Sequence, residues 1–207
     1  MRERKGYKNA EVYADQERLP AGGYILKVLN VKFEEGKTYK DNNGNQKKAD
    51  DKIIVSFDIT EGDYKDFYKK NYAAQTSEDK KWKGNYRIQV PEDDAPKDEE
   101  WKMRRFKTIM VAFEESNPGF HWDWDEQKLK GKLIGALFNN KEYDFNGRHG
   151  FFTNCHSLVT VEKIRSGNFT IPDDTLLKNS NKTPAPQEDT GFMNIPTGLD
   201  SEEFPWN

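Results

Sequence analysis

The 207-residue sequence predicts a mainly β domain with one helix (α+β), arranged as a five-stranded barrel with long loops and followed by a disordered acidic tail. Three observations carry this prediction. Several short segments alternate apolar and polar residues, which is typical of half-buried strands. One segment has helical spacing instead. From residue 171 onward the apolar pattern stops, and Pro, Asn, Thr and acidic residues dominate, as in chains that do not pack a core.

The first strands lie in the N-terminal half. A turn signal over residues 19–23 precedes an apolar segment over 24–33, which we expect to be a strand. A polar loop over 34–51 follows. Residues 53–60 then alternate between apolar and polar side chains, which predicts a half-buried strand.

Two further segments precede the helix. Residues 64–72 are expected to form a third strand or strand-like ribbon, and 86–90 a short strand. The spacing then becomes helical over 101–113, with acidic residues at 98–100 where the helix dipole favours them. The helix ends at Asn117-Pro118-Gly119.

The last strands are expected over 133–138 and 151–164, with Asn146-Gly147 as a hairpin signal between them. With 64–72 counted as a ribbon, the resulting order is three strands, a helix and two strands, which is the order of the OB-fold barrel. Another antiparallel α+β domain remains the alternative. We therefore expect an N-terminal extension over 1–18, an OB-type domain over 19–170 and a flexible tail over 171–207.

Charge and composition exclude several classes. No run of about 18 apolar residues is present, so no membrane span is expected. The N-terminus lacks the apolar stretch of a secretory signal, and the single Cys155 cannot form an internal disulfide, so a cytoplasmic setting is expected. The tail has a net charge of −5, which leaves +2 for residues 1–170 of the total of −3.

Residues 64–87 interleave aromatic rings with basic side chains. Single-stranded nucleic acid needs this combination, because bases stack on rings and cations follow the phosphates. The alternative is that half of the rings are core and the lysines only solvated. The candidate binding residues in this stretch are Tyr64, Lys65, Phe67, Tyr68, Lys69, Lys70, Tyr72, Lys81, Trp82, Lys83, Tyr86 and Arg87.

Two loops add candidates. Lys37, Lys40, Lys47 and Lys48 surround the loop over 34–51, and Phe145 and Arg148 flank the expected hairpin turn. In OB folds the ligand lies across strands 2 and 3, between the loops that join strands 1–2 and 4–5. These segments fall in those two loops. A plain turn with packed rings is the alternative for the hairpin. The helix carries a basic cluster at 102–107, for which solvated charges are the simpler interpretation.

No cofactor, metal or catalytic site is expected. His149, Cys155 and His156 lack a second pair of ligands for zinc, and no nucleophile elbow or phosphate-binding glycine loop occurs.

At the end of the tail, two large aromatic side chains accompany acidic ones. We interpret this tip as a motif that docks into a protein partner, through Glu202, Glu203, Phe204, Pro205 and Trp206.

Together these features resemble the single-stranded DNA-binding proteins of bacteria and phages. Residues 19–24 and 130–135 are similar to the entries to strands 1 and 4 of phage-encoded members from Gram-positive hosts. Residues 200–206 resemble the acidic tail tip of the bacterial members, but here Trp206 and Asn207 follow the proline. The resemblance covers residues 19–166 by architecture and 198–207 by motif.

The resemblance implies a non-enzymatic protein that coats single-stranded DNA during replication, recombination or repair. It also implies that the tail recruits replication or recombination proteins in the cytoplasm, which for a phage protein is the host's. A protein-interaction module, such as a phage structural or host-interaction factor, is the alternative. RNA binding and the oligomeric state are left open, with a homo-oligomer as one option.

Overall fold

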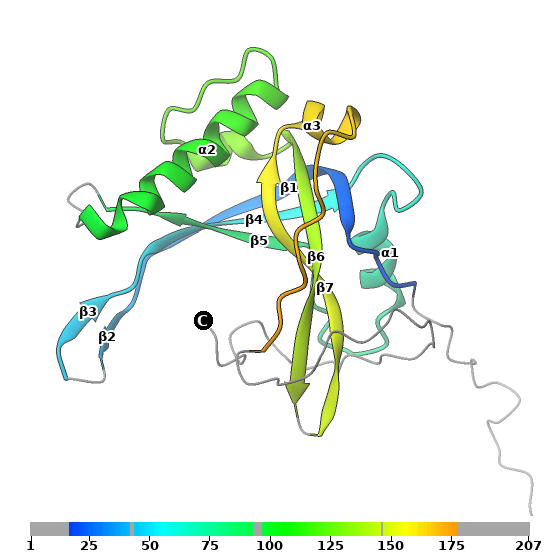
Figure 1. Ribbon diagram of the computed structural model, residues 1–207, viewed down its shortest axis with the longest axis horizontal. Coiled ribbons are helices and arrows are strands. Elements are labelled where there is room, and N and C mark those ends of the chain that lie inside the picture. Colours follow the sequence, from blue (N-terminus) through cyan, green and yellow to red (C-terminus); the bar gives the residue numbers. More distant parts are fainter. Residues whose placement is uncertain (1–16, 42–43, 93–96, 146, 178–207) are drawn as a thin grey trace, which may run out of the picture. The chain divides into compact units, whose positions relative to one another are not determined.

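The computed structural model describes residues 17–41, 44–92, 97–145 and 147–177 (Figure 1). The chain divides into two units. Residues 19–179 hold all the helices and strands described below. Residues 1–18 and 180–207 make the second unit, of which only residues 17 and 18 are described, so the expected docking tip over 202–206 lies outside the described residues.

Seven strands and three α-helices occur in the described part of the chain. Five strands form one antiparallel sheet in the order β5-β4-β1-β6-β7. They are β1 (Gly22–Glu34), β4 (Asp51–Ile59), β5 (Asn85–Val90), β6 (Leu133–Phe145) and β7 (Arg148–Val159). A separate hairpin of β2 (Thr38–Lys40) and β3 (Gln46–Lys48) lies between β1 and β4 in the chain. The helices are α1 (Phe67–Ala74), α2 (Glu100–Ser116) and α3 (Val161–Arg165). Two 3-10 turns lie at Lys97–Glu99 and Glu126–Leu129.

The strand connections make a Greek key. β1, β4 and β5 are consecutive neighbours, and β6 returns after α2 to pair with the other edge of β1. This arrangement of a meander and a returning fourth strand defines the motif. The expected mainly β domain is confirmed, but the expected closed barrel is wrong. β5 and β7 are the two edges of the sheet, and the described residues contain no pairing between them.

Helix α2 explains why the core is covered without strand closure. It packs against β5, β6 and β7. The buried face of α2 places large apolar side chains over the part of the core that a closing strand pair would cover in a barrel. Burial removes the apolar surface of these side chains from water. These side chains are Phe106, Ile109, Met110 and Phe113. The expected helix over 101–113 is thus confirmed, although two further helices accompany it.

Strand β4 carries the clearest alternation of the fold. Ile53, Val55, Phe57 and Ile59 are nearly fully buried and face the core. Val55 lies between Val31 of β1 and Tyr86 of β5, so both neighbours bury the same face. Since side chains alternate with a period of two, the other face of these strands points away from the core.

The segment 64–72, expected as a strand, contains helix α1, and the strand expectation is wrong. The carboxylate of Asp58, at the end of β4, accepts hydrogen bonds from the backbone N–H groups of Tyr68 (2.9 Å) and Lys69 (3.0 Å). These are among the orphan donors of the first helical turn. The buried Asp58 therefore caps α1 from a neighbouring strand, a signal that is absent from the helix's own sequence.

A second boundary differs from expectation. The strand expected over 151–164 stops at Val159, and α3 follows. The side chain of Thr160 accepts a hydrogen bond from the N–H of Lys163 (3.2 Å), and Glu162 lies in the first turn. This is the N-cap chemistry that starts a helix.

Residues 173–177, which the sequence assigns to the tail, lie along the part of β6 that extends beyond its pairing with β1. The N–H of Glu142 donates to the carbonyl of Thr175 (2.9 Å), and the N–H of Thr175 donates to Asn140 (2.8 Å). Buried Asn139 adds side-chain bonds to Asp173 and Thr175. The chain is therefore held to the sheet as far as Leu177, whose N–H bonds to the Glu142 carboxylate.

Replacing Asp58 with alanine should lower the free energy of unfolding by about 2–3 kcal/mol, because the buried amides at the start of α1 lose their acceptor. Urea denaturation followed by circular dichroism measures this. The matched control is Asp63→Ala, an exposed aspartate in the same connection, which should change stability by less than about 0.5 kcal/mol. Equal effects of the two substitutions would contradict the capping role.

Candidate nucleic-acid interface

The β2–β3 hairpin, with residues 35–41 and 44–50, forms an arm that extends from the sheet (Figure 1). Tyr39 pairs with Lys47 across the hairpin, and 51% of the Tyr39 side chain is exposed. The four candidate lysines of this loop are all exposed. Lys37 and Lys40 make no ion pair among the residues that the structure describes. A ring and several cations thus share one projecting ribbon.

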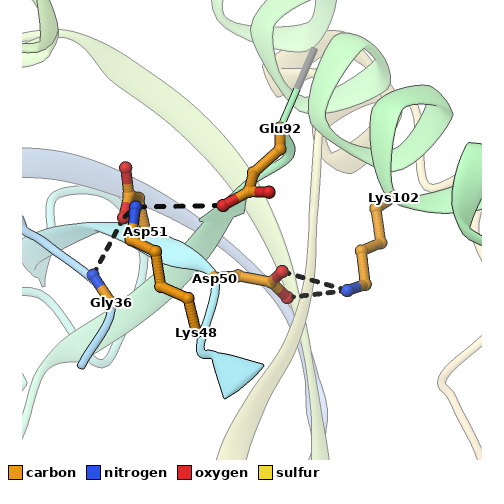
Figure 2. Close-up of polar contacts among 6 residues, drawn as sticks. All are labelled: Gly36, Lys48, Asp50, Asp51, Glu92 and Lys102. Atoms are coloured by element: carbon orange, nitrogen blue, oxygen red, sulfur yellow. Dashed lines mark hydrogen bonds and ion pairs between the residues drawn. The ribbon is translucent and has the colours of Figure 1, made fainter. Parts of the chain in front are cut away.

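Carboxylates at the root of the arm are engaged in its own structure (Figure 2). Asp51 accepts a hydrogen bond from the Gly36 N–H (2.8 Å) and pairs with Lys48 (3.1 Å). The Gly36 bond, followed by the Lys48 contact, lowers the pKa of Asp51. Lys48 lies also 3.8 Å from Glu92, and the Asp51 hydrogen bond raises the pKa of Lys48.

Gly36 is required at this root by close approach. A Cβ on Gly36 would lie 1.7 Å from the carbonyl oxygen of Ala49 on the returning chain. No side chain fits at that distance, so the two chains of the arm meet there only because residue 36 is glycine. The glycine and the Asp51 carboxylate together fix how the arm leaves the sheet.

We call the solvent-facing side of β1, β4 and β5 the outer face. It follows from the register, because the residues between the buried positions pair in rows across the three strands. It carries three cations, Lys32, Lys52 and Arg87, and one acid, Glu34. The Lys32 ammonium lies 3.8 Å from the Glu34 carboxylate. The rows are Asn30–Ser56–Asn85, Lys32–Ile54–Arg87 and Glu34–Lys52–Gln89.

Aromatic side chains border one end of the outer face. Asn85 Nδ2 donates to the carbonyl of Trp82 (3.0 Å). This bond ties the segment that carries the Trp82 ring to the row that contains Asn85. Trp82 packs 5.8 Å from Tyr72 between ring centroids, and Tyr72 is 39% exposed. The Lys80 ammonium lies 5.9 Å from the Tyr72 centroid, within cation–π distance.

The Trp82 ring is held rigidly. Its Nε1–H donates to the carbonyls of Phe57 (3.2 Å) and Gly84 (3.0 Å). A Cβ on Gly84 would lie 2.4 Å from the Phe57 oxygen, so this approach again needs glycine. A ring that is already fixed loses little conformational entropy when a base stacks on it.

Other predicted rings are in the core. Phe67, Tyr68 and Tyr86 are only 7–8% exposed, and Tyr64 packs against the core from its margin. Burial raises the pKa of Tyr68 and of Tyr86. These three buried rings support the fold and offer no face to a base in this structure. The basic residues Lys65, Lys69, Lys70 and Lys83 are exposed and Lys81 is half-buried.

The predicted β6–β7 hairpin does not join this surface. Phe145 pairs with Arg148 at its end, Phe145 half-buried and Arg148 exposed. Figure 1 shows this end well away from both the arm and α1. Of the three segments expected to converge, the structure therefore connects two through the outer face and leaves the third apart.

The sequence reasoning missed two features of the site. Tyr39 lies within the predicted basic loop, and its alternation with the lysines was a usable signal. Lys32 and Lys52 face outward because their neighbours in sequence face the core, so the same alternation that predicts β4 also predicts the outer face.

No family model matches the sequence, and no curated protein matches it. Among the described residues, no group of three or more His, Cys, Asp or Glu side chains is placed to hold a metal ion. No helix in the described part of the chain is long and apolar enough to cross a membrane.

Protonation of Asp51 should be visible at the Gly36 amide. Because the folded pKa lies below the ordinary value of 3.8, the bond stabilises the arm root above that pH and is lost as the pH falls through the lower folded pKa. A titration of the Gly36 amide shift by NMR should therefore have its midpoint below 3.8. Asp51→Asn is the control and should abolish the transition, whereas a midpoint at or above 3.8 would exclude the bond.

Proposed function

We propose that this chain is a non-enzymatic protein that binds single-stranded DNA without strong sequence preference. The observation that carries the proposal is the placement of rings and cations along the same strands. Tyr72 and Trp82 lie near one end of the outer face, its cations lie in rows across the strands, and the arm with Tyr39 continues β1 and β4 from the other end. In Figure 1, β1, β4 and β5 span the distance between α1 and the arm.

The chemistry of this surface suits a single strand. Exposed rings at both ends can stack on bases, which contributes about 1–3 kcal/mol per base whatever its identity. Lysines and Arg87 between them can follow the phosphates. The carboxylates of Asp50 and Asp51 are occupied by Lys102 and Lys48, which reduces their repulsion of a phosphate chain.

We further propose that the sheet is an opened OB-type barrel. Three features support this: the Greek key, the position of α2 between β5 and β6 in the chain, and the long connection between β1 and β4. OB barrels are partly open and bind oligonucleotides on strands 2 and 3 and the loops joining strands 1–2 and 4–5. In this proposal β4 and β5 correspond to strands 2 and 3 and the arm to the first of these loops, while the β6–β7 hairpin lies apart from the arm.

The acidic tail completes the proposal. Residues 202–206 combine two carboxylates with two aromatic rings, and we propose that they recruit replication or recombination proteins while the sheet holds DNA. The proposed setting is the cytoplasm of a bacterium, or of a phage's host.

A protein-interaction module is the second candidate, favoured by one surface feature. Trp124 is 63% exposed and has a positive φ of 68°, which costs free energy for a non-glycine residue. Its ring stacks on Phe106 and lies between Asp123 and Asp125 in the sequence. Exposed tryptophans are frequent anchors of protein interfaces, and the nearby acids make this surface unfavourable for phosphate.

Two substitutions on the arm should separate stacking from charge. Tyr39→Ala should weaken binding of oligo-dT by about 1–3 kcal/mol at every salt concentration, because one stacking ring is lost. Lys40→Gln should instead reduce the steepness of log K against log salt by about 0.7, the contribution of one phosphate contact on a single strand. Fluorescence anisotropy of a labelled oligo-dT measures both.

The matched control is Trp124→Ala, which removes a more exposed ring from the acidic loop and should leave both quantities unchanged. If the wild-type chain does not bind oligo-dT at low salt, DNA binding is excluded. If Trp124→Ala is the variant that abolishes capture of a protein partner while Tyr39→Ala has no effect on oligo-dT, the interaction module is the better description.

A further inference from the structure

One exposed stripe of α2 carries a tryptophan together with basic side chains. Trp101, Arg104, Arg105 and Thr108 follow one another at helical spacing, so they share a face of the helix. All four are exposed, and Trp101 has 46% of its surface accessible. The apolar face of α2 that packs on the core is a different one, and from the stripe Arg105 adds a hydrogen bond to the hydroxyl of Tyr86.

The first turn of α2 is fixed to the root of the arm. The Lys102 ammonium lies 3.0 Å from each carboxylate oxygen of Asp50 (Figure 2). It also lies 2.7 Å from Glu99. Only 14% of the Lys102 side chain is exposed. The Glu99 hydrogen bond, followed by that to Asp50, raises the pKa of Lys102. The first turn of α2, which includes Trp101, is therefore held to the root of the arm, where Lys102 offsets part of the charge of two carboxylates.

A second contact places the stripe at the edge of the sheet. Arg105 donates to the hydroxyl of Tyr86 on β5 (3.1 Å). Among the described residues β5 pairs only with β4, and α2 packs against β5. Arg87, the next residue of β5, lies on the outer face. Because β5 is an edge strand, DNA that passes over this edge from the outer face comes next to the side of β5 on which Arg105 bonds to Tyr86.

We propose that Trp101, Arg104 and Arg105 form a second contact for single-stranded DNA, which binds the nucleotides that extend past β5. This inference rests on the proposed function and extends the path of the DNA beyond β5. The indole can stack on a base, and the guanidinium groups can pair with phosphate oxygens. Trp124 differs, because Asp123 and Asp125 flank it and the nearby Lys128 pairs with both of these acids.

The test uses labelled oligo-dT of two lengths, because a second contact matters only to a strand long enough to reach it. One of about 6 nucleotides lies near the lower end of the range for one OB domain, and one of about 30 exceeds that range. In fluorescence anisotropy with the full chain, Trp101→Ala should weaken binding of the long strand roughly 5-fold to 150-fold, equivalent to one stacked base. Binding of the short strand should be unchanged.

Arg104→Gln is an independent variant that does not depend on the tryptophan. Its guanidinium is on the exposed stripe and bonds to neither Tyr86 nor Asp50. It should reduce the salt dependence by about 0.7 for the long strand alone. Trp101→Phe keeps a ring and should restore most of the long-strand affinity. Trp124→Ala is the control for loss of an exposed tryptophan and should bind both strands like the wild type.

An unchanged long-strand affinity in Trp101→Ala, or an equal loss for both lengths, would overturn the second contact while leaving DNA binding in place. Failure of the wild type to bind either strand would instead overturn the proposed function itself. Thermal unfolding establishes that each variant is folded, and if Trp101→Ala does not fold, the salt dependence of Arg104→Gln decides the question.

Discussion

Burial of one face of β4 is the constraint on which the rest of the structure depends. Ile53, Val55, Phe57 and Ile59 turn into the core. Ile53 and Val55 pair with residues of both β1 and β5, and Phe57 and Ile59 pair with residues of β1. A slip of one residue would expose this apolar row, so the register is strongly specified. The outer face exists as the necessary complement of that burial, with its polar and basic side chains aligned in rows.

Both ends of the same strand also position its surroundings. At its first residue, Asp51 binds Gly36 and Lys48 and sets the direction of the arm. Near its end, Asp58 caps α1, which carries Tyr72 toward Trp82. One strand thus determines the register of the sheet, the root of the arm and the place of the exposed rings. The proposed DNA path follows this strand from one end to the other.

Sequence reasoning reached the parts of the fold that have a local cause. The alternation over 53–60 and the helical spacing over 101–113 reflect burial on one side of a single element, and both elements are present. Helix α1 was missed because its cap, Asp58, comes from a neighbouring strand. The closed barrel was wrong because α2 covers the core between β5 and β7, which is a tertiary arrangement that no single segment encodes.

The candidate site divides in the same way. Lysines of the arm are exposed, as polar loop residues are expected to be. The sequence could not separate core rings from surface rings in residues 64–87, because Tyr and Phe suit both places. The fold makes that separation: Tyr68 and Tyr86 fill the core, while Tyr72 is exposed.

Photo-crosslinking of the full chain to single-stranded DNA tests the account most directly. An oligonucleotide of halogenated deoxyuridine, irradiated in the complex and mapped by mass spectrometry, reports which rings lie against bases. Crosslinks at Tyr39, Tyr72 and Trp82 are the predicted result. Crosslinks confined to Phe145 on the β6–β7 hairpin or to Trp124 would contradict binding across the outer face.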